Sequence, residues 1–315
     1  MTEESRETLL KKAMLYEQAE MHDDMLSAMR KLASLSTTGL DNTERKLFSN
    51  AHKNVVGKKR TAWRAISLVE QKLVEADNPK KDLVRRYSAN IVDELRKDCE
   101  ELLALLENHV IPKSSEPESK VFFLKMKGDY LRYLVEVSSS ESGNGNGNGN
   151  GDDDEKEKSK RAYLEAIEVS EKDLAVAHPY RLGLALNFSV FQFEIENCPE
   201  KAYELAKKAF DDAIPELDNL KEEEIEDATT IMQLLRDNLT FWNEDWHAAT
   251  IARSILVQRK RLHRKTFCMQ CPCNFNKLYS INYFHNFTMT MWICQGELSV
   301  VKKTNLKELL KLFRL

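Results

Sequence analysis

The stretch Lys120–Val137, KVFFLKMKGDYLRYLVEV, decides the fold class of this chain. Its apolar residues recur at about 100° per residue, the angular spacing of an α-helix, and so form a single stripe. The stripe consists of Phe123, Met126, Tyr130, Leu134 and Val137. Lys125, Asp129 and Arg132 fall on the opposite face at spacings of four and three, so their side chains can reach one another. The stretch predicts an amphipathic helix, and its charged face alone is typical of a solvated surface.

The remainder of the chain favours an all-α protein. Charged residues make up 31% of the 315 residues, and the chain has only 10 Gly and 7 Pro. Five of the glycines lie in one tract, GNGNGNGNG at 143–151, so few residues elsewhere break helices. Helical periodicity predicts about nine helices, mostly antiparallel and joined by short connections. The later ones are expected at about 82–110, 119–138, 159–176, 179–196, 199–216 and 221–243.

Charge and composition divide the chain into two parts. Residues 1–245 are expected to form one helical domain, with a flexible surface loop at about 139–158 that is rich in Gly, Asn, Asp and Ser. Residues 246–315 carry 12 of the 47 Lys and Arg residues but only 2 of the 51 Asp and Glu residues. We therefore expect an acidic domain followed by a basic C-terminal extension that is poorly ordered.

A basic row lies in the segment AHKNVVGKKRTAWR, residues 51–64. Lys53, Arg60 and Arg64 are spaced seven and four residues apart, so they share one helix face, and Gly57 lies between them. A solvated charged face explains this pattern. A row of cations around a small residue would also suit an anion that approaches the helix closely.

Two further helices place amides among apolar residues. In RLGLALNFSVFQFEIEN, residues 181–197, Asn187 and Glu194 share one face, and in IMQLLRDNLTFW, residues 231–242, an amide interrupts an apolar row. The first face also holds Val190, with Leu186 beside it, and the second consists of Ile231, Leu234, Asn238 and Trp242. Taken alone, an Asn whose hydrogen bonds are satisfied within the core or groove explains Asn187 better than a ligand contact does. Taken together, clustered cations, two amides and an apolar wall are the groups expected in a site that binds a phosphorylated peptide.

Several segments of the chain, in order, resemble the 14-3-3 family. They are YEQAEMHDDM, HKNVVGKKRTAWR, SKVFFLKMKGDYLRYLVEV, HPYRLGLALNFSVF and IMQLLRDNLTFW, and the resemblance runs from about Thr2 to Asp245. It implies nine antiparallel helices, a cup-shaped protomer, a dimer, and an amphipathic groove that binds phosphoserine or phosphothreonine peptides.

The resemblance also implies roles for individual residues. The phosphate would be held by Lys53, Arg60, Arg132 and Tyr133. The groove would be lined by Lys125, Asp129, Leu186, Asn187, Val190, Glu194, Ile231, Leu234, Asn238 and Trp242. Within this set, Asp129 would orient the arginines, and the two asparagines would bind the main chain of the ligand. Thr230 stands where the family usually has Leu, which would shift peptide preference without abolishing binding.

The expected dimer face departs further from the family pattern. It would consist of Leu15, Ala19, Met21, Asp24, Ile66, Tyr87 and Glu94. Met21 and Asn90 stand where many members have Arg and Lys, so two intersubunit salt bridges are missing. Exposed ion pairs contribute only about 0–1 kcal/mol each. We therefore expect a homodimer, or a heterodimer with family members, that is weaker or differently selective. Ala62 replaces a serine whose phosphorylation splits the dimer in some members.

We expect a phosphopeptide-binding adaptor and not an enzyme, because the sequence shows no nucleophile–base pairing and no Gly-rich phosphate loop. Its partners would be phosphorylated client proteins. One alternative is a helical scaffold that binds partners independently of phosphate. Another is nucleic-acid binding through the basic segment RKRLHRK, which the acidic main domain argues against.

The cysteines and the hydropathy bound the remaining possibilities. Cys268, Cys271 and Cys273 could bind zinc with a further His or Cys from the extension, namely His263, His285 or Cys294, but CxxCxC lacks a second pair at finger spacing. We expect no metal and no cofactor. The charged N-terminus lacks a signal pattern, and no apolar run reaches 18 residues. A cytoplasmic location follows as the expectation, and the basic segment leaves a nuclear one open.

Overall fold

A computed structural model describes residues 4–142 and 150–263, with side chains for 4–138 and 153–243. Within these residues the chain is helical throughout, without a strand, and it contains nine α-helices. They are α1 (Arg6–Gln18), α2 (His22–Leu35), α3 (Asn42–Glu75), α4 (Lys81–Leu105), α5 (Pro117–Ser142), α6 (Asn150–Asp173), α7 (Pro179–Glu194), α8 (Pro199–Ala213) and α9 (Glu222–His263). This confirms the predicted fold class.

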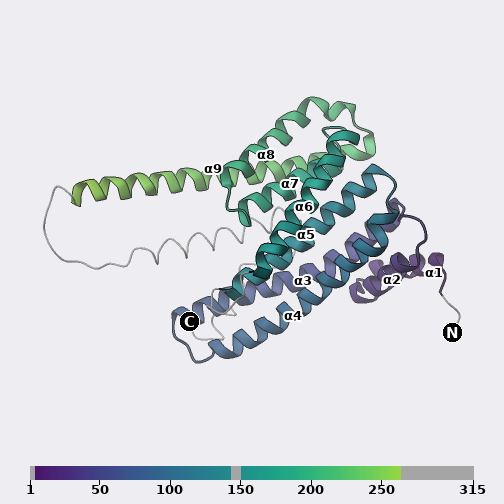
Figure 1. Ribbon diagram of the computed structural model, residues 1–315, viewed down its shortest axis with the longest axis horizontal. Helices are drawn as coiled ribbons and strands as arrows, with labels where there is room; N and C mark the ends of the chain where they lie inside the picture. The colour runs from purple at the N-terminus through teal and green to yellow at the C-terminus, as the bar shows by residue number, and fades with distance from the viewer. Residues whose placement is uncertain (1–3, 143–149, 264–315) are drawn as a thin grey trace.

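Helices that follow one another in the sequence lie side by side. The closest packing joins α1 to α2, α3 to α4, α5 to α6 and α7 to α8. Figure 1 shows α3 and α4 as a long pair and α9 as a helix that continues beyond its neighbours. None of the helices in the described part of the chain combines the length and apolarity that crossing a membrane requires.

Local sequence explains where the main helices begin. Asp41 accepts a hydrogen bond from the Glu44 backbone N–H, and the Glu44 side chain accepts one from the Asp41 N–H, which forms a capping box at the start of α3. Proline occupies the first turn of α7 and of α8, where no intrahelical N–H is needed. These caps set the positions of the helices that carry the site.

The apolar stripe of the opening stretch lies in the core. Phe123 and Val137 are fully buried on α5 and belong to a cluster that joins the first five helices and reaches Ala162 of α6. A second cluster joins α7, α8 and α9 around Leu186, Leu235 and Trp242. The charged face of α5 is thus the face left for other contacts.

The expected loop is shorter in the structure than the sequence indicated. Helix α5 continues to Ser142 and α6 already begins at Asn150, so residues 150–158 are helical. Acidic residues such as Asp153 and Asp154 stabilise a helix N-terminus, and Lys158 pairs with Asp154 one turn earlier at 2.6 Å. Composition alone missed both effects.

Two other boundaries differ from the expectation. The helix expected at 82–110 changes after Leu105 into a π-helical turn, Leu106–Val110, followed by a 3-10 turn, Ile111–Lys113. The last helix, expected at 221–243, runs to His263, so the expected domain boundary at 245/246 lies inside α9. No Gly or Pro interrupts residues 221–263. The three cysteines of the zinc hypothesis lie outside the described residues.

The buried residue His52 makes the stability of the fold depend on pH. His52 on α3 is fully buried, and its Nδ1 lies 2.8 Å from the Phe48 carbonyl oxygen, to which Nδ1–H donates. Burial lowers the pKa of His52 to about 3. In the unfolded chain the His52 ring is protonated below about pH 6.5, whereas in the folded chain it stays neutral down to a much lower pH. The contribution of His52 to stability is therefore complete above pH 6.5 and declines as the pH falls toward 3.

We predict that the free energy of unfolding falls by about 1.4 kcal/mol between pH 7.5 and 5.5 on account of His52 alone. The variant His52→Asn should lose this part of the pH dependence, whatever its absolute stability, in urea unfolding at the two pH values. His109→Asn, at a half-buried position on the π-helical turn, is the control and should keep the wild-type difference. Equal pH dependence in His52→Asn and wild type would contradict the assignment.

Candidate functional site

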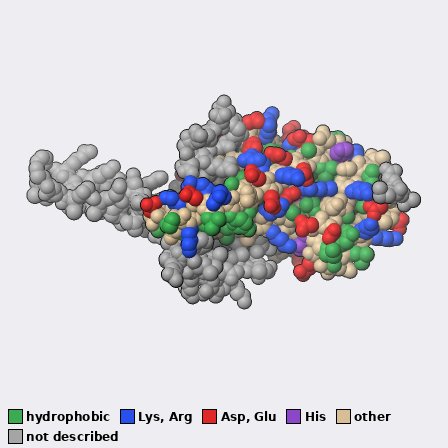
Figure 2. Space-filling model, turned by 90° about the horizontal axis from the view of Figure 1, so that it is seen from below, with side chains coloured by type: hydrophobic (Ala, Val, Ile, Leu, Met, Phe, Trp, Pro, Cys, Tyr) green, Lys and Arg blue, Asp and Glu red, His purple; other side chains and the backbone are tan. Residues whose placement is uncertain are grey.

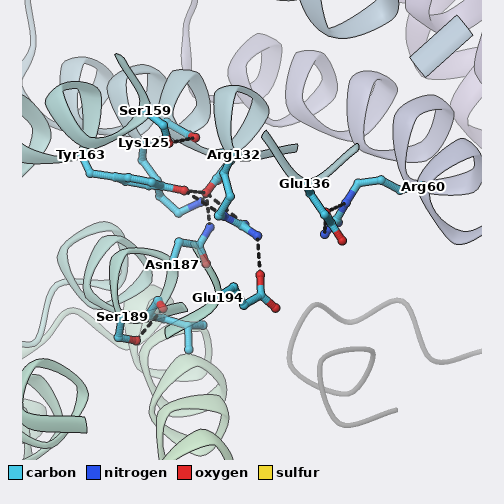
Figure 3. Close-up of polar contacts among 12 residues, drawn as sticks. Arg60, Lys125, Arg132, Glu136, Ser159, Tyr163, Asn187, Ser189 and Glu194 are labelled. Carbon is cyan, nitrogen blue, oxygen red and sulfur yellow. Dashed lines mark hydrogen bonds and ion pairs between the residues drawn. The ribbon is translucent and has the colours of Figure 1, made fainter. Parts of the chain in front are cut away.

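The charged faces of α3 and α5 meet in a cluster of guanidinium groups. Arg60 of α3 and Arg132 of α5 are each only 1% exposed. Their Cζ atoms lie 3.8 and 4.9 Å from the centroid of the Tyr133 ring, so both contact this residue. Lys53 lies exposed on α3, two turns before Arg60. Figure 3 shows the two arginines approaching from separate helices.

Glu136 holds the arginines of α3 in place. Arg60 Nε donates to Glu136 Oε2 at 2.9 Å, and Arg64 Nε donates to Oε1 at 2.7 Å. Burial alone would raise the pKa of the Glu136 carboxyl, but the charges of Arg60 and Arg64 outweigh it and lower the pKa to about 2. This carboxylate therefore stays ionised and offsets the repulsion between the two guanidinium groups.

Asp129 organises the other half of the cluster. Its carboxylate accepts hydrogen bonds from Lys125 Nζ at 2.8 Å, Tyr163 Oη at 2.6 Å and Asn187 Nδ2 at 2.7 Å, and Arg132 lies 3.7 Å away. Burial raises the pKa of Asp129, but the charges of Lys125 and Arg132 and the hydrogen bonds from Lys125 and Tyr163 outweigh it, so the net shift is downward. Asp129 thus joins α5 to α6 and α7 while it positions Arg132.

Tyr163 reaches Asp129 because α5 carries a glycine. A Cβ atom added at Gly128 would lie 2.8 Å from the Tyr163 ring, closer than side chains approach. The ring therefore lies directly on the α5 backbone, and its hydroxyl meets Asp129. Ser159, one turn earlier on α6, donates to the Gly128 carbonyl at 2.9 Å. The close approach of α6 fixes the charged face of α5.

A second carboxylate faces Arg132 from α7. Glu194 Oε2 lies 3.6 Å from Arg132 Nη1, and the Glu194 side chain is 8% exposed. Burial raises the pKa of the Glu194 carboxyl, and the nearby charge of Arg132 only partly opposes this. Figure 3 shows Glu194 and Asn187 on the same side of Arg132.

The apolar residues expected beside this cluster lie on α7 and α9. Leu186, Val190 and Trp242 are buried in one cluster, and Ile231 and Leu234 pack against it half-buried. The Trp242 ring stacks on Phe193 with a centroid separation of 5.1 Å. Asn238 lies among them on α9 at 3% exposure. Thr230, which directly precedes Ile231 on α9, is exposed.

Alternate helices therefore supply the expected residues. Helix α3 contributes Arg60, α5 contributes the Lys125–Tyr133 segment, α7 contributes the Leu186–Glu194 segment, and α9 contributes the Ile231–Trp242 segment. The arrangement brings together paired cations, two amides and an apolar wall, which is chemistry suited to an anionic peptide.

Comparison with known proteins gives the family of the chain. The 14-3-3 protein family model matches residues 12–243. The chain belongs to the 14-3-3 family. It is 50% identical over 240 residues to 14-3-3 protein zeta of Bombyx mori, an alignment that covers 76% of this chain and 93% of that protein. Members of this family act as adaptors, as the resemblance implied.

Sequence analysis did not include Glu136 or Tyr163 among the site residues of this 14-3-3 chain. Glu136 follows Arg132 by four residues on the same helix face, and that spacing was the available signal. Its partners Arg60 and Arg64 lie on another helix, and spacing within one helix carries no information about that pairing. No pattern in the sequence indicated a role for Tyr163.

The expected dimer face of the 14-3-3 chain belongs to the segment from α1 to α4. Leu15 is 63% exposed on α1 and Tyr87 is 59% exposed on α4, although both are large apolar residues. Ala19, Met21, Asp24 and Glu94 are exposed as well, whereas Ile66 is half-buried beside Val69. Glu94 pairs with Lys59 of the same chain at 3.2 Å. Seen from below, Figure 2 shows hydrophobic side chains gathered in separate areas among charged ones.

We predict that Gly128→Ala destabilises the protein by about 1–3 kcal/mol, because the new methyl group must displace the Tyr163 ring. Urea unfolding measures the loss. Gly183→Ala is the matched control: it also adds a methyl group to a buried helical glycine, but the nearest atoms lie 3.7 Å away. It should leave stability unchanged or raise it slightly. Equal destabilisation by the two substitutions would contradict the role of Gly128.

Proposed function

We propose that this chain binds phosphoserine- or phosphothreonine-containing segments of client proteins in the groove between α3, α5, α7 and α9. One observation carries the proposal: Arg60 and Arg132 lie buried against Tyr133 and are positioned by carboxylates of the protein itself. A phosphate group brings up to two negative charges and three acceptor oxygens, which guanidinium groups match through paired hydrogen bonds.

The carboxylates favour binding because they place the arginines before the ligand arrives. Glu136 and Asp129 offset the repulsion among the guanidinium groups, so little reorganisation is needed on binding. Lys53, exposed on α3, adds positive charge at the approach to the site. Specificity for phosphate over an uncharged hydroxyl follows from these charges.

The peptide main chain and its flanking side chains have separate partners in this proposal. Asn187 is fixed by its hydrogen bond to Asp129, and its amide oxygen can accept a peptide N–H. Asn238 serves the same purpose on α9. The apolar wall that begins at Leu186 would take up hydrophobic side chains of the ligand.

We further propose that the chain acts as a dimer. Two grooves in one particle can hold two phosphorylated segments of one client, or bridge two clients, and this raises the effective affinity. The role is stoichiometric: the protein masks, clamps or connects its partners. The large apolar residues Leu15 and Tyr87 support the dimer, since both are exposed in the protomer and an interface would cover them.

The arginines give the direct test of phosphate binding. Arg60→Ala and Arg132→Ala should each weaken binding of a phosphoserine peptide by about 10- to 150-fold, since a hydrogen bond to a charged group contributes about 1.5–3 kcal/mol. Titration calorimetry measures the affinity, and circular dichroism checks that the variants are folded. Arg236→Ala, at an exposed site on α9, is the control with the same change in charge. If partner binding is unchanged in both arginine variants, the chain is a phosphate-independent scaffold.

The dimer is tested by placing a charge on its expected face. Leu15→Asp should weaken association by about 100-fold or more, because a symmetric dimer contains each substitution twice. Sedimentation equilibrium at micromolar concentration should show a dimer for the wild type and a monomer for this variant. Ile214→Asp is the control, at a 51% exposed apolar position after α8. A wild-type monomer under these conditions would overturn the proposal.

A further inference from the structure

Glu194 occupies an unusual place beside the cationic cluster. It is the last residue of α7, and Oε2 of its nearly buried side chain lies 3.6 Å from Arg132 Nη1. Its other oxygen, Oε1, is buried and has no hydrogen-bond partner among the residues that the structure describes. The carboxylate therefore relies on one long ion pair with a guanidinium that the ligand would also use.

Glu194 is the least supported of the three carboxylates around the arginines. Asp129 accepts three hydrogen bonds and Glu136 accepts two from guanidinium groups. The charges that act on Glu194 come from Arg132 and Glu136 of α5 and from Arg60 and Arg64 of α3. Burial and the negative charge of Glu136 raise the pKa of the Glu194 carboxyl, whereas the three arginines lower it, and the net shift is upward.

We propose that Glu194 takes up a proton from solvent when a dianionic phosphate group binds at Arg132, so that phosphopeptide binding by this chain is linked to pH. The inference rests on the proposed function and adds a regulatory property to the same site. A phosphate on Arg132 lies only a few ångströms from Glu194, and like charges at that separation oppose joint ionisation. The protonated carboxyl can then donate its O–H to a phosphate oxygen.

The linkage has a defined pH window. Above about pH 7 phosphoserine is a dianion, because its second pKa lies near 6. Between pH 8.5 and 7 the affinity should therefore rise as the pH falls, since proton uptake accompanies binding. An uptake of half a proton corresponds to about a threefold change in affinity per pH unit. Below about pH 6 the phosphate itself takes up a proton, and the trend reverses.

Calorimetry of the full-length chain tests the proposal without any substitution. A phosphoserine peptide is titrated at pH 7.5 in buffers that differ in ionisation enthalpy, and the slope of the observed enthalpy gives the number of protons taken up. We expect a net uptake of up to about one proton per peptide by wild type. The variant Glu194→Gln should take up none, and its affinity should be constant between pH 7 and 8.5. Glu200→Gln, at an exposed position on α8, should behave like wild type.

The outcomes separate the two proposals. Phosphate-dependent binding without proton uptake by wild type would overturn the role of Glu194 alone. Uptake of the same size in Glu194→Gln would also overturn it, because another group would then be the acceptor. If the peptide binds equally with and without its phosphate, the proposed function fails, and the inference about Glu194 fails with it.

Discussion

The rest of the structure depends on how three buried guanidinium groups are held together. Arg60 and Arg64 come from α3 and Arg132 comes from α5, and each would repel the others if no anion lay between them. Glu136 pairs with the first two, and Asp129 and Glu194 lie beside the third. Removing one partner from such a buried arrangement costs far more than an exposed ion pair contributes.

This constraint explains why alternate helices line the site and why the intervening ones matter. Helices α3, α5 and α7 carry the charged groups, but α6 fixes their geometry through Tyr163, whose ring requires Gly128. The same hydroxyl holds Asp129, and Asp129 in turn fixes Asn187 on α7. Gly128 on α5 therefore determines where the amide of Asn187 on α7 lies.

The sequence predicted what depends on spacing within one helix. The stripe that begins at Phe123 is buried, and Asp129 lies within 4 Å of both Lys125 and Arg132, as the spacing of helical turns allows. The resemblance to the 14-3-3 family, carried by five segments, gave the number and order of the helices, and the match over residues 12–243 agrees with it. It also implied which residues line the groove, and that assignment stays a prediction.

The missed features arise from contacts between helices or from competing local effects. Glu136 could be placed on the correct face of α5, but its pairing with α3 depends on tertiary packing. Composition indicated a loop up to residue 158, whereas acidic residues such as Asp153 and Asp154 favour a helix start. A change in net charge suggested a boundary at 245/246, but charge alone does not end a helix, and α9 continues.

The most direct test of the account is the affinity of the wild-type chain for one peptide in phosphorylated and unphosphorylated form, measured at a single salt concentration. The buried arginines and their paired carboxylates predict that the phosphorylated form binds at least about 100-fold more tightly, since a phosphate adds at least two hydrogen bonds to charged groups. Equal affinity for the two forms would contradict the account.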